Sequence, residues 1–152
     1  MDEKDKDLLL KDICGRLRYR VKTPYSGYEM TIRGVDIESK TVDVIDWGKA
    51  RFAAVRIEKI KPYLRSLDSM TAEEAHEIGK ILWDGFNRGV EIRTDCISIV
   101  DSDVNIFTFL EMQAVLDYLN KKMFDINHLI PKGMAVEMPK EMYSVTKNKD
   151  EM

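Results

Sequence analysis

Residues 41–71 of the chain read TVDVIDWGKARFAAVRIEKIKPYLRSLDSMT. Two short apolar runs with strand-like spacing lead into residues 57–65 and then into Thr71, which has the features of a helix cap. The stretch joins a basic half to an acidic half: residues 1–66 carry 15 Lys or Arg and 11 Asp or Glu, whereas residues 67–152 carry 9 and 16. Such a charge split indicates an anionic partner on one side, or two faces that attract each other within the fold.

Upstream of this stretch, the apolar pattern predicts a short helix that ends near Gly15 and is followed by bent strands. From residue 16 the apolar period falls to two, which is typical of a half-buried strand. The apolar phase changes again at Gly34, and a phase change at glycine indicates a β-bulge. Short strands with bulges and tight turns can curl on themselves. We therefore expect residues 1–66 to form a short helix plus a small bent β-barrel that resembles the Src-homology-3 type.

The second half has the pattern of a mixed α and β unit. Thr71 and Glu74 have the spacing of a capping box, and the apolar stripe after them predicts a helix. Alternating residues within 88–107 predict a short antiparallel meander, whose strand order stays open, before a second helix. The predicted fold class is thus α+β, with residues 67–145 packed on the barrel and a flexible polar tail over 146–152.

Composition predicts the compartment. Hydrophobic residues make up 44% of the chain and charged residues 34%, as in ordinary soluble globular proteins. No apolar run approaches the roughly 18 residues that cross a bilayer, and the acidic start differs from a signal peptide, so we expect a cytoplasmic protein with no membrane partner. Cys14 and Cys96 lack metal-binding spacing. Both are predicted to be small buried apolar residues without a disulfide.

Two motifs begin like metal sites but lack essential residues. Residues 76–80 read HEIGK, and Lys80 occupies the place where a zinc-protease helix needs its second histidine. Residues 101–105 read DSDVN, like the start of a calcium loop, but Ile106 and Met112 stand where that loop needs Gly and Glu. An exposed helix face and a polar hairpin turn explain these motifs, so no metal is predicted.

Catalytic signatures are also missing from the sequence. Asp125, His128 and Glu137 could do acid–base work or bind a metal, but capping and loop hydrogen bonds account for them without chemistry. The chain has no Gly-x-Ser-x-Gly elbow and no Gly-rich loop before a helix. The sequence therefore predicts no catalytic residue and no cofactor, although an enzymatic function stays open as a third hypothesis.

Cations and aromatic residues of the first half are the best candidates for a binding site. Cations neutralise phosphates and aromatic rings stack on bases, so a small barrel with both could hold nucleic acid. The predicted binding residues are Arg18, Arg20, Lys22, Trp47, Arg56, Lys59, Lys61 and Arg65. The opposing interpretation is a solvated strand face paired with acidic residues. The pI of about 5.5 favours it, because dedicated nucleic-acid binders usually exceed a pI of about 9.

Three blocks of sequence span nearly the whole chain. They are residues 6–12 with 16–17; residues 57–65 running on to 69–71; and residues 117–120 through 124–125, 129–133 and 142–143. In these blocks the chain resembles a widespread family of small proteins from gut-bacterial genomes and their prophages and mobile elements. That family has no assigned activity, so the resemblance implies no catalytic residues. It implies an accessory or regulatory binding role. The family often has His where Lys122 and Met123 stand here, which puts a metal site at these positions in doubt.

The leading hypothesis is a non-enzymatic cytoplasmic binding module that holds a protein partner, on the exposed barrel face or in the groove between the halves. The alternative is a nucleic-acid-binding accessory protein that uses the basic barrel face. The identity of the partner and the oligomeric state stay open at this point.

Overall fold

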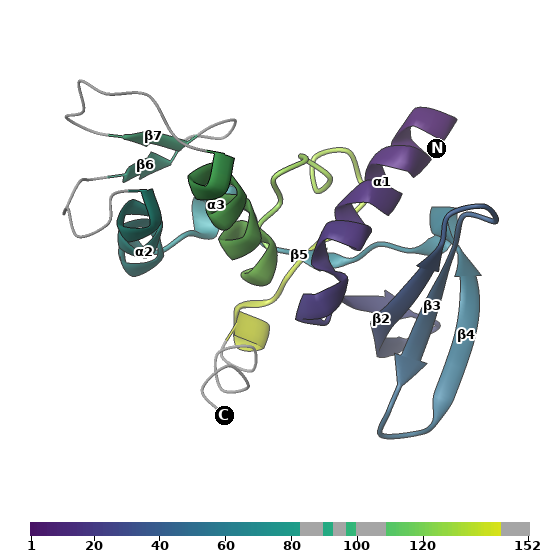
Figure 1. Ribbon diagram of the computed structural model, residues 1–152. Helices are drawn as coiled ribbons and strands as arrows, with labels where there is room; N and C mark the ends of the chain where they lie inside the picture. The colour runs from purple at the N-terminus through teal and green to yellow at the C-terminus, as the bar shows by residue number, and fades with distance from the viewer. Residues whose placement is uncertain (83–89, 93–96, 100–108, 144–152) are drawn as a thin grey trace. The chain divides into compact units, whose positions relative to one another are not determined.

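A computed structural model describes residues 1–82, 90–92, 97–99 and 109–143. The described residues form two compact units of an α+β protein (Figure 1). The first unit contains residues 1–65 together with 127–143, and the second contains residues 66–126 with their gaps. None of the helices in these described ranges is long and apolar enough to cross a membrane.

Helix α1 (Glu3–Arg16) opens the first unit. Its N-cap is Asp2, whose Oδ1 accepts a hydrogen bond from the Asp5 backbone N–H at 2.8 Å. Acidic residues in the first turn also suit the positive end of the helix dipole. Leu9 and Ile13 lie four residues apart on one face and are fully buried, so the helix is held by an apolar stripe as well as by its cap.

The half-buried strand predicted from Arg16 onward is wrong. Helix α1 runs through Gly15, because Asp12 and Arg16 pair one turn apart inside the unit. The chain then continues as the 3₁₀ helix η1 (Leu17–Tyr19), and Arg20 takes a left-handed conformation with φ of 63°. The period-two pattern in this segment therefore belongs to a tight helical turn, and the first strand begins only after it.

Four antiparallel strands form the main sheet, in the order β1-β2-β3-β4. They are β1 (Lys22–Tyr25), β2 (Tyr28–Asp36), β3 (Thr41–Asp46) and β4 (Arg51–Arg56). Ser26 and Gly27, both with positive φ, make the tight turn between β1 and β2. In β2 the pairing with β3 shifts register between Ile32 and Gly34, which confirms the bulge predicted at that glycine.

The predicted Src-homology-3-like barrel is wrong, because the sheet is open. A barrel requires its edge strands to be paired with each other, whereas β1 and β4 are the two edges of this sheet. After β4, the 3₁₀ helix η2 (Ile57–Lys59) turns the chain. Strand β5 (Tyr63–Leu64) then pairs in parallel with β8 (Val136–Glu137), far along the chain. Closure therefore fails because β5 bonds to the returning C-terminal segment instead of to the sheet.

The two faces of the open sheet differ. Helix α1 contacts β2 on the inner face. That face carries the buried residues Met30, Ile32, Val42, Val44 and Val55. The opposite face, called the outer face below, carries Lys22, Glu29, Thr31, Arg33, Asp36, Thr41, Asp43, Ile45, Phe52, Ala54 and Arg56. Cross-strand pairing places Lys22, Thr31, Ile45 and Phe52 in one row across all four strands.

The second unit is built around two helices. Its elements are η3 (Leu67–Ser69), α2 (Ala72–Leu82), β6 (Val90–Ile92), β7 (Ile97–Ile99) and α3 (Phe109–Lys121). Ile78 and Leu82 of α2 pack with Leu119 and Phe124 in its core. Strands β6 and β7 pair antiparallel, as the predicted meander requires. The predicted third strand, at 104–106, and the flexible tail over 146–152 lie outside the described residues.

The predicted capping box at the start of α2 is confirmed. The Thr71 Oγ1 accepts from the Glu74 backbone N–H at 3.1 Å, and the Glu74 Oε1 accepts from the Thr71 backbone N–H at 3.1 Å. Each bond satisfies a backbone donor that the helix itself cannot pair.

Exposed ion pairs tie α1 to the rest of the first unit. The Lys6 Nζ lies 2.8 Å from a Glu58 carboxylate oxygen and 3.2 Å from one of Glu3, and Lys40 pairs with Glu3 and Asp7. Hydrogen bonds from Lys40 and then Lys6 lower the pKa of Glu3, and Lys6 lowers the pKa of Glu58. The same contacts raise the pKa values of Lys6 and Lys40.

We expect Lys6→Met to destabilise the protein at neutral pH and to lose this effect in acid. A carboxyl group with a lowered pKa in the folded state contributes stability above the ordinary glutamate pKa of about 4.3, and that contribution is lost as the pH falls through the folded value. The urea midpoint of Lys6→Met should thus lie below that of the wild type at pH 7. The two midpoints should converge as the pH falls below about 4.

The matched control is Lys4→Met, which removes an exposed lysine from the same helix. It should leave the midpoint nearly unchanged at both pH values. Added salt should also narrow the gap between Lys6→Met and the wild type, because exposed ion pairs are screened. A gap that stays constant down to pH 3 would show that the packing of the lysine stem is responsible, and not its charge.

Candidate ligand-binding site

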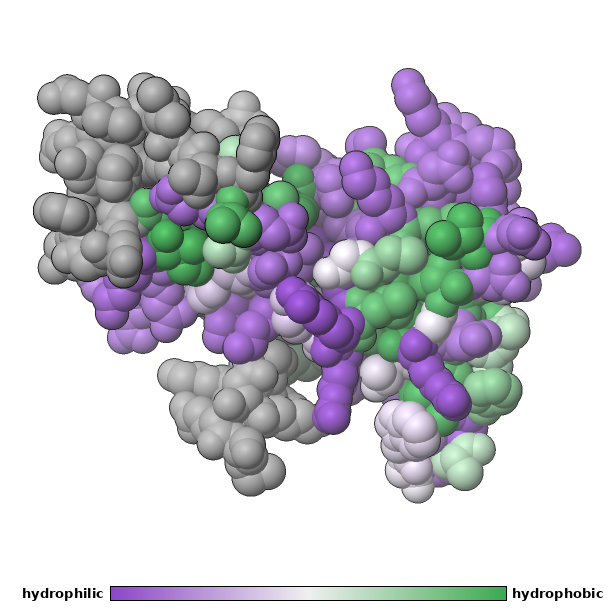
Figure 2. Space-filling view, in the orientation of Figure 1, coloured by the Kyte–Doolittle hydropathy of each residue, from purple (hydrophilic) through white to green (hydrophobic). Residues whose placement is uncertain are grey.

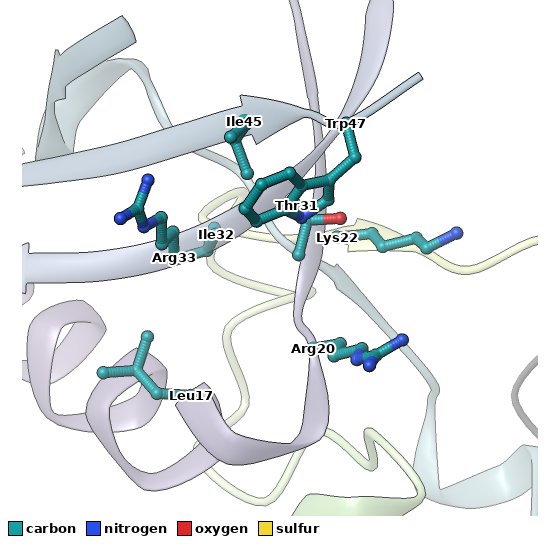
Figure 3. A pocket seen from close by; sticks show the side chains of 8 residues that line it. All are labelled: Leu17, Arg20, Lys22, Thr31, Ile32, Arg33, Ile45 and Trp47. Carbon is teal, nitrogen blue, oxygen red and sulfur yellow. The ribbon is translucent and has the colours of Figure 1, made fainter. Parts of the chain in front are cut away.

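A pocket of about 520 Å³ opens in the first unit, where the outer face of the sheet meets η1 (Figure 3). Its lining comes from η1, the segment that leads into β1, strands β1, β2 and β3, and the turn after β3. The residues are Leu17, Arg20, Lys22, Thr31, Ile32, Arg33, Ile45 and Trp47. Three of the eight are cations and one is a large aromatic residue, so the pocket offers both charge and a flat apolar surface.

Trp47 is the aromatic residue of this site and is strongly exposed. It follows β3 at the start of the turn to β4, and 71% of its surface is accessible. In Figure 3 its indole lies over Thr31, between Arg33 on one side and Lys22 on the other. Ile45, two residues earlier on the same face, is only 8% exposed and lines the pocket. The indole is thus presented to solvent instead of being used in the core.

Two tyrosine rings near the pocket are already stacked with cations. The Arg51 guanidinium carbon lies 3.6 Å from the centroid of the Tyr28 ring, and that of Arg18 lies 4.7 Å from the centroid of Tyr19. The corresponding distance from Arg33 to Trp47 is 5.9 Å, near the limit of a cation–π contact. Trp47 therefore has room for a planar ligand, whereas Tyr28 is covered closely by an arginine.

Local backbone geometry places the cations. Arg33 is the inserted residue of the β2 bulge, because Ile32 pairs with Val44 and Gly34 already pairs with Asp43. Bulges re-aim side chains, and this one turns Arg33 toward the pocket. Arg20 takes its left-handed conformation just before β1. The bulge and the left-handed residue thus bring together cations that are 13 residues apart in the sequence.

The pocket is basic, but one of its cations pairs with an acidic residue. Lys22 forms an ion pair with Glu29 at 2.8 Å, and both side chains are partly exposed. Across residues 16–61, which contain η1 and the sheet, there are eleven Lys or Arg and six Asp or Glu, a net charge of +5. Figure 2 shows hydrophobic residues gathered over the strands of the first unit, with hydrophilic residues around them. The surface therefore suits a ligand that is anionic and partly apolar.

The structure brings together three of the predicted binding residues and leaves the others apart from the pocket. Arg20, Lys22 and Trp47 line it. Those outside the lining and exposed are Arg18, Arg56, Lys59 and Lys61. Arg65 is buried, at 5% exposure, with its guanidinium carbon 4.0 Å from the centroid of the Tyr143 ring. Among the predicted residues, Arg65 is therefore a packing residue and does not belong to this surface.

Arg33 and Phe52 were absent from the predicted set. Phe52 is 66% exposed and pairs with Ile45 on the outer face. The position of Val55 could have identified Phe52 as exposed. In a strand, residues three apart point to opposite faces, so an inward Val55 requires an outward Phe52.

The remaining candidates fall elsewhere. Cys14 is exposed, contrary to the prediction of a buried residue, and Cys96 lies outside the described residues. Asp125 is buried in the second unit, whereas His128 and Glu137 are exposed residues of the first. Within the described ranges, no three His, Cys, Asp or Glu side chains are grouped so as to hold a metal ion.

Comparison with known proteins gives no relative from which a role could be transferred. No protein-family model, no curated protein and no solved structure matches the chain. The pocket and the outer face of the sheet are therefore the basis for a functional proposal.

Proposed function

We propose that this protein is a binding module that holds single-stranded nucleic acid on the outer face of its sheet. The observation that supports the proposal is the pocket, where an indole with 71% exposure lies among Arg20, Lys22 and Arg33. Proteins that bind single strands combine cations that track the backbone with aromatic rings on which bases stack. In this role Trp47 stacks on a base, and the three cations neutralise neighbouring phosphates.

Duplex DNA fits this surface less well. An open, concave pocket with one exposed ring receives a base only when that base is unstacked, and a base inside a duplex is covered on both sides. Stacking is also tolerant of sequence, because every base has a flat face. We therefore expect weak sequence preference and a clear preference for single strands.

Replacing Trp47 by alanine is expected to weaken single-strand binding about 5- to 150-fold, since stacking on one aromatic residue contributes about 1–3 kcal/mol. The measurement is fluorescence anisotropy with a labelled oligothymidylate of about 12 nucleotides, a length within the range of known single-strand sites. A second readout uses the Trp83→Phe background, in which Trp47 is the one remaining tryptophan and its quenching by oligonucleotide reports stacking directly.

Two variants serve as controls. Trp47→Phe keeps an aromatic ring and should retain most of the affinity. Ile37→Ala removes an apolar side chain with 69% exposure that lies outside the pocket lining, and it should bind like the wild type. A flat titration of the wild type at low salt would rule the proposal out.

A protein partner with an acidic extended segment is the second candidate function. It is favoured by the exposed apolar residues Ile37 and Phe52 and by strand β4, whose free edge has no strand partner among the described residues. Exposed apolar residues and free strand edges are typical of protein interfaces. Polyglutamate separates the two candidates. It should bind without quenching Trp47 if charge alone is recognised, whereas an oligonucleotide should quench it.

A further inference from the structure

We infer that Phe52 is a second base-stacking residue, so that the outer face holds two consecutive bases, one on Trp47 and one on Phe52. The inference rests on the proposed function and adds to it a site residue and a minimum ligand length. It is carried by cross-strand register and by exposure.

The register places Phe52 directly beyond the pocket. Thr31 pairs with Ile45, and Ile45 pairs with Phe52, so the three lie in one row on the outer face. Neighbouring strands lie about 4.8 Å apart, which puts Phe52 one strand spacing past Ile45 and two past Thr31. In Figure 3 the Trp47 indole lies over Thr31. Trp47 follows Ile45 by two residues, and Phe52 pairs with Ile45 across β3 and β4, so both aromatic residues adjoin Ile45.

The surface beside Phe52 leaves room for a planar group. Phe52 is 66% exposed, and the next outer-face residue along β4 is Ala54, which is small and itself exposed. Ala54 pairs with Asp43, and Asp43 pairs in turn with Gly34, so these three residues form the next row across the sheet. The residues at both ends of this row, Ala54 and Gly34, are small. No bulky side chain of this row therefore covers the Phe52 ring.

The cations nearest the two rings favour a nucleic acid over an uncharged apolar partner. Arg33 lies next to Trp47, and Arg56 is exposed at the end of β4 on the same face as Phe52. Asp43 lies between them and is partly buried, and Asp36 is an exposed acid in the same row as Arg56. Cations on either side of the two rings match a ligand that alternates flat bases with phosphates.

The test compares ligands of one and two nucleotides in the Trp83→Phe background. Phe52→Ala should weaken binding of the dinucleotide pTpT about 5- to 150-fold, because one stacked base is lost, and should leave binding of thymidine monophosphate unchanged. Trp47→Ala leaves no tryptophan in this background, so its binding is followed by the anisotropy of labelled ligands, and it should bind both more weakly. Phe52→Tyr keeps a ring and should bind pTpT like the parent, whereas Phe52→Leu keeps apolar area without a ring and should not.

Photocrosslinking gives an independent readout that does not depend on weak affinities. Tryptic cleavage places Trp47 in the peptide of residues 41–49 and Phe52 in the peptide of residues 52–56. Ultraviolet irradiation of a bound oligothymidylate should crosslink both peptides.

The outcomes separate this inference from the proposed function. If Phe52→Ala binds pTpT like the parent and crosslinks form on the 41–49 peptide alone, Phe52 does not stack, while single-strand binding at Trp47 stands. If neither pTpT nor a longer oligonucleotide binds the parent protein at low salt, both proposals fail.

Discussion

Replacing Asp12 by alanine is expected to lower the free energy of unfolding by about 3–5 kcal/mol, because it removes one partner of a buried ion pair. Asp12 is 3% exposed and Arg16 is fully buried. The Arg16 Nε donates to one carboxylate oxygen at 2.8 Å and its Nη2 to the other at 3.0 Å, while the Asn127 Nδ2 donates to Asp12 Oδ1 at 2.8 Å. Urea unfolding followed by circular dichroism measures the loss.

Asp7→Ala is the matched control, since it removes an exposed carboxylate from the same helix that pairs with Lys40 at 3.1 Å. Exposed pairs contribute about 0–1 kcal/mol, so its effect should be several times smaller. A double variant, Asp12→Leu with Arg16→Met, should be more stable than Asp12→Ala, because neither charge then remains buried. If Asp12→Ala costs no more than Asp7→Ala, the buried pair does not stabilise the fold.

The helix that holds this ion pair was predicted correctly from sequence, whereas the segment after it was not. Apolar spacing and acidic residues near the start predict α1 well, because both act within one turn of the helix. The conformation of the next segment depends on Arg16, whose side chain is buried by the fold, and on the left-handed Arg20. An alternating pattern of arginines resembles a strand face, and nothing local in the sequence distinguishes it from a 3₁₀ turn.

The barrel prediction failed because barrel closure depends on pairing between residues far apart in the sequence. The bulge at Gly34 and the capping box at Thr71 involve neighbouring residues, and both were predicted from sequence. Barrel closure depends on which strand pairs with which. Here β5 pairs with β8, and Tyr63 lies opposite Val136, which is more than 70 residues away in the sequence. Pairing over such a separation is decided by tertiary packing and leaves no local signature.

The site was predicted in part, for a related reason. Residue chemistry identified Arg20, Lys22 and Trp47 as candidates, and these three meet in the pocket. Chemistry alone also selected Arg65, which is buried, because a basic side chain in a sequence does not reveal whether it faces solvent. Arg33 required knowledge of the bulge that re-aims it.

Neutralising the three pocket cations should have the largest effect on ligand binding. The variant Arg20→Gln, Lys22→Gln and Arg33→Gln removes three phosphate contacts at once. For single strands the logarithm of affinity falls with the logarithm of salt concentration by about 0.7 per phosphate contact, so three contacts give a slope of about −2. The wild type should thus lose about 20-fold in affinity between about 50 and 200 mM salt, and the variant should bind several hundredfold more weakly at the lower concentration.

The control for net charge is Lys4→Gln with Lys11→Gln and Lys132→Gln, three exposed lysines of the first unit that lie outside the pocket lining. Both triple variants carry the same change in charge, so general attraction to a polyanion weakens equally in the two. The pocket variant alone should also flatten the salt dependence and abolish quenching of Trp47, because a base then has no neighbouring phosphate contact to hold it on the indole. Equal losses in the two variants would show that the anion binds the basic first unit diffusely, without using the pocket.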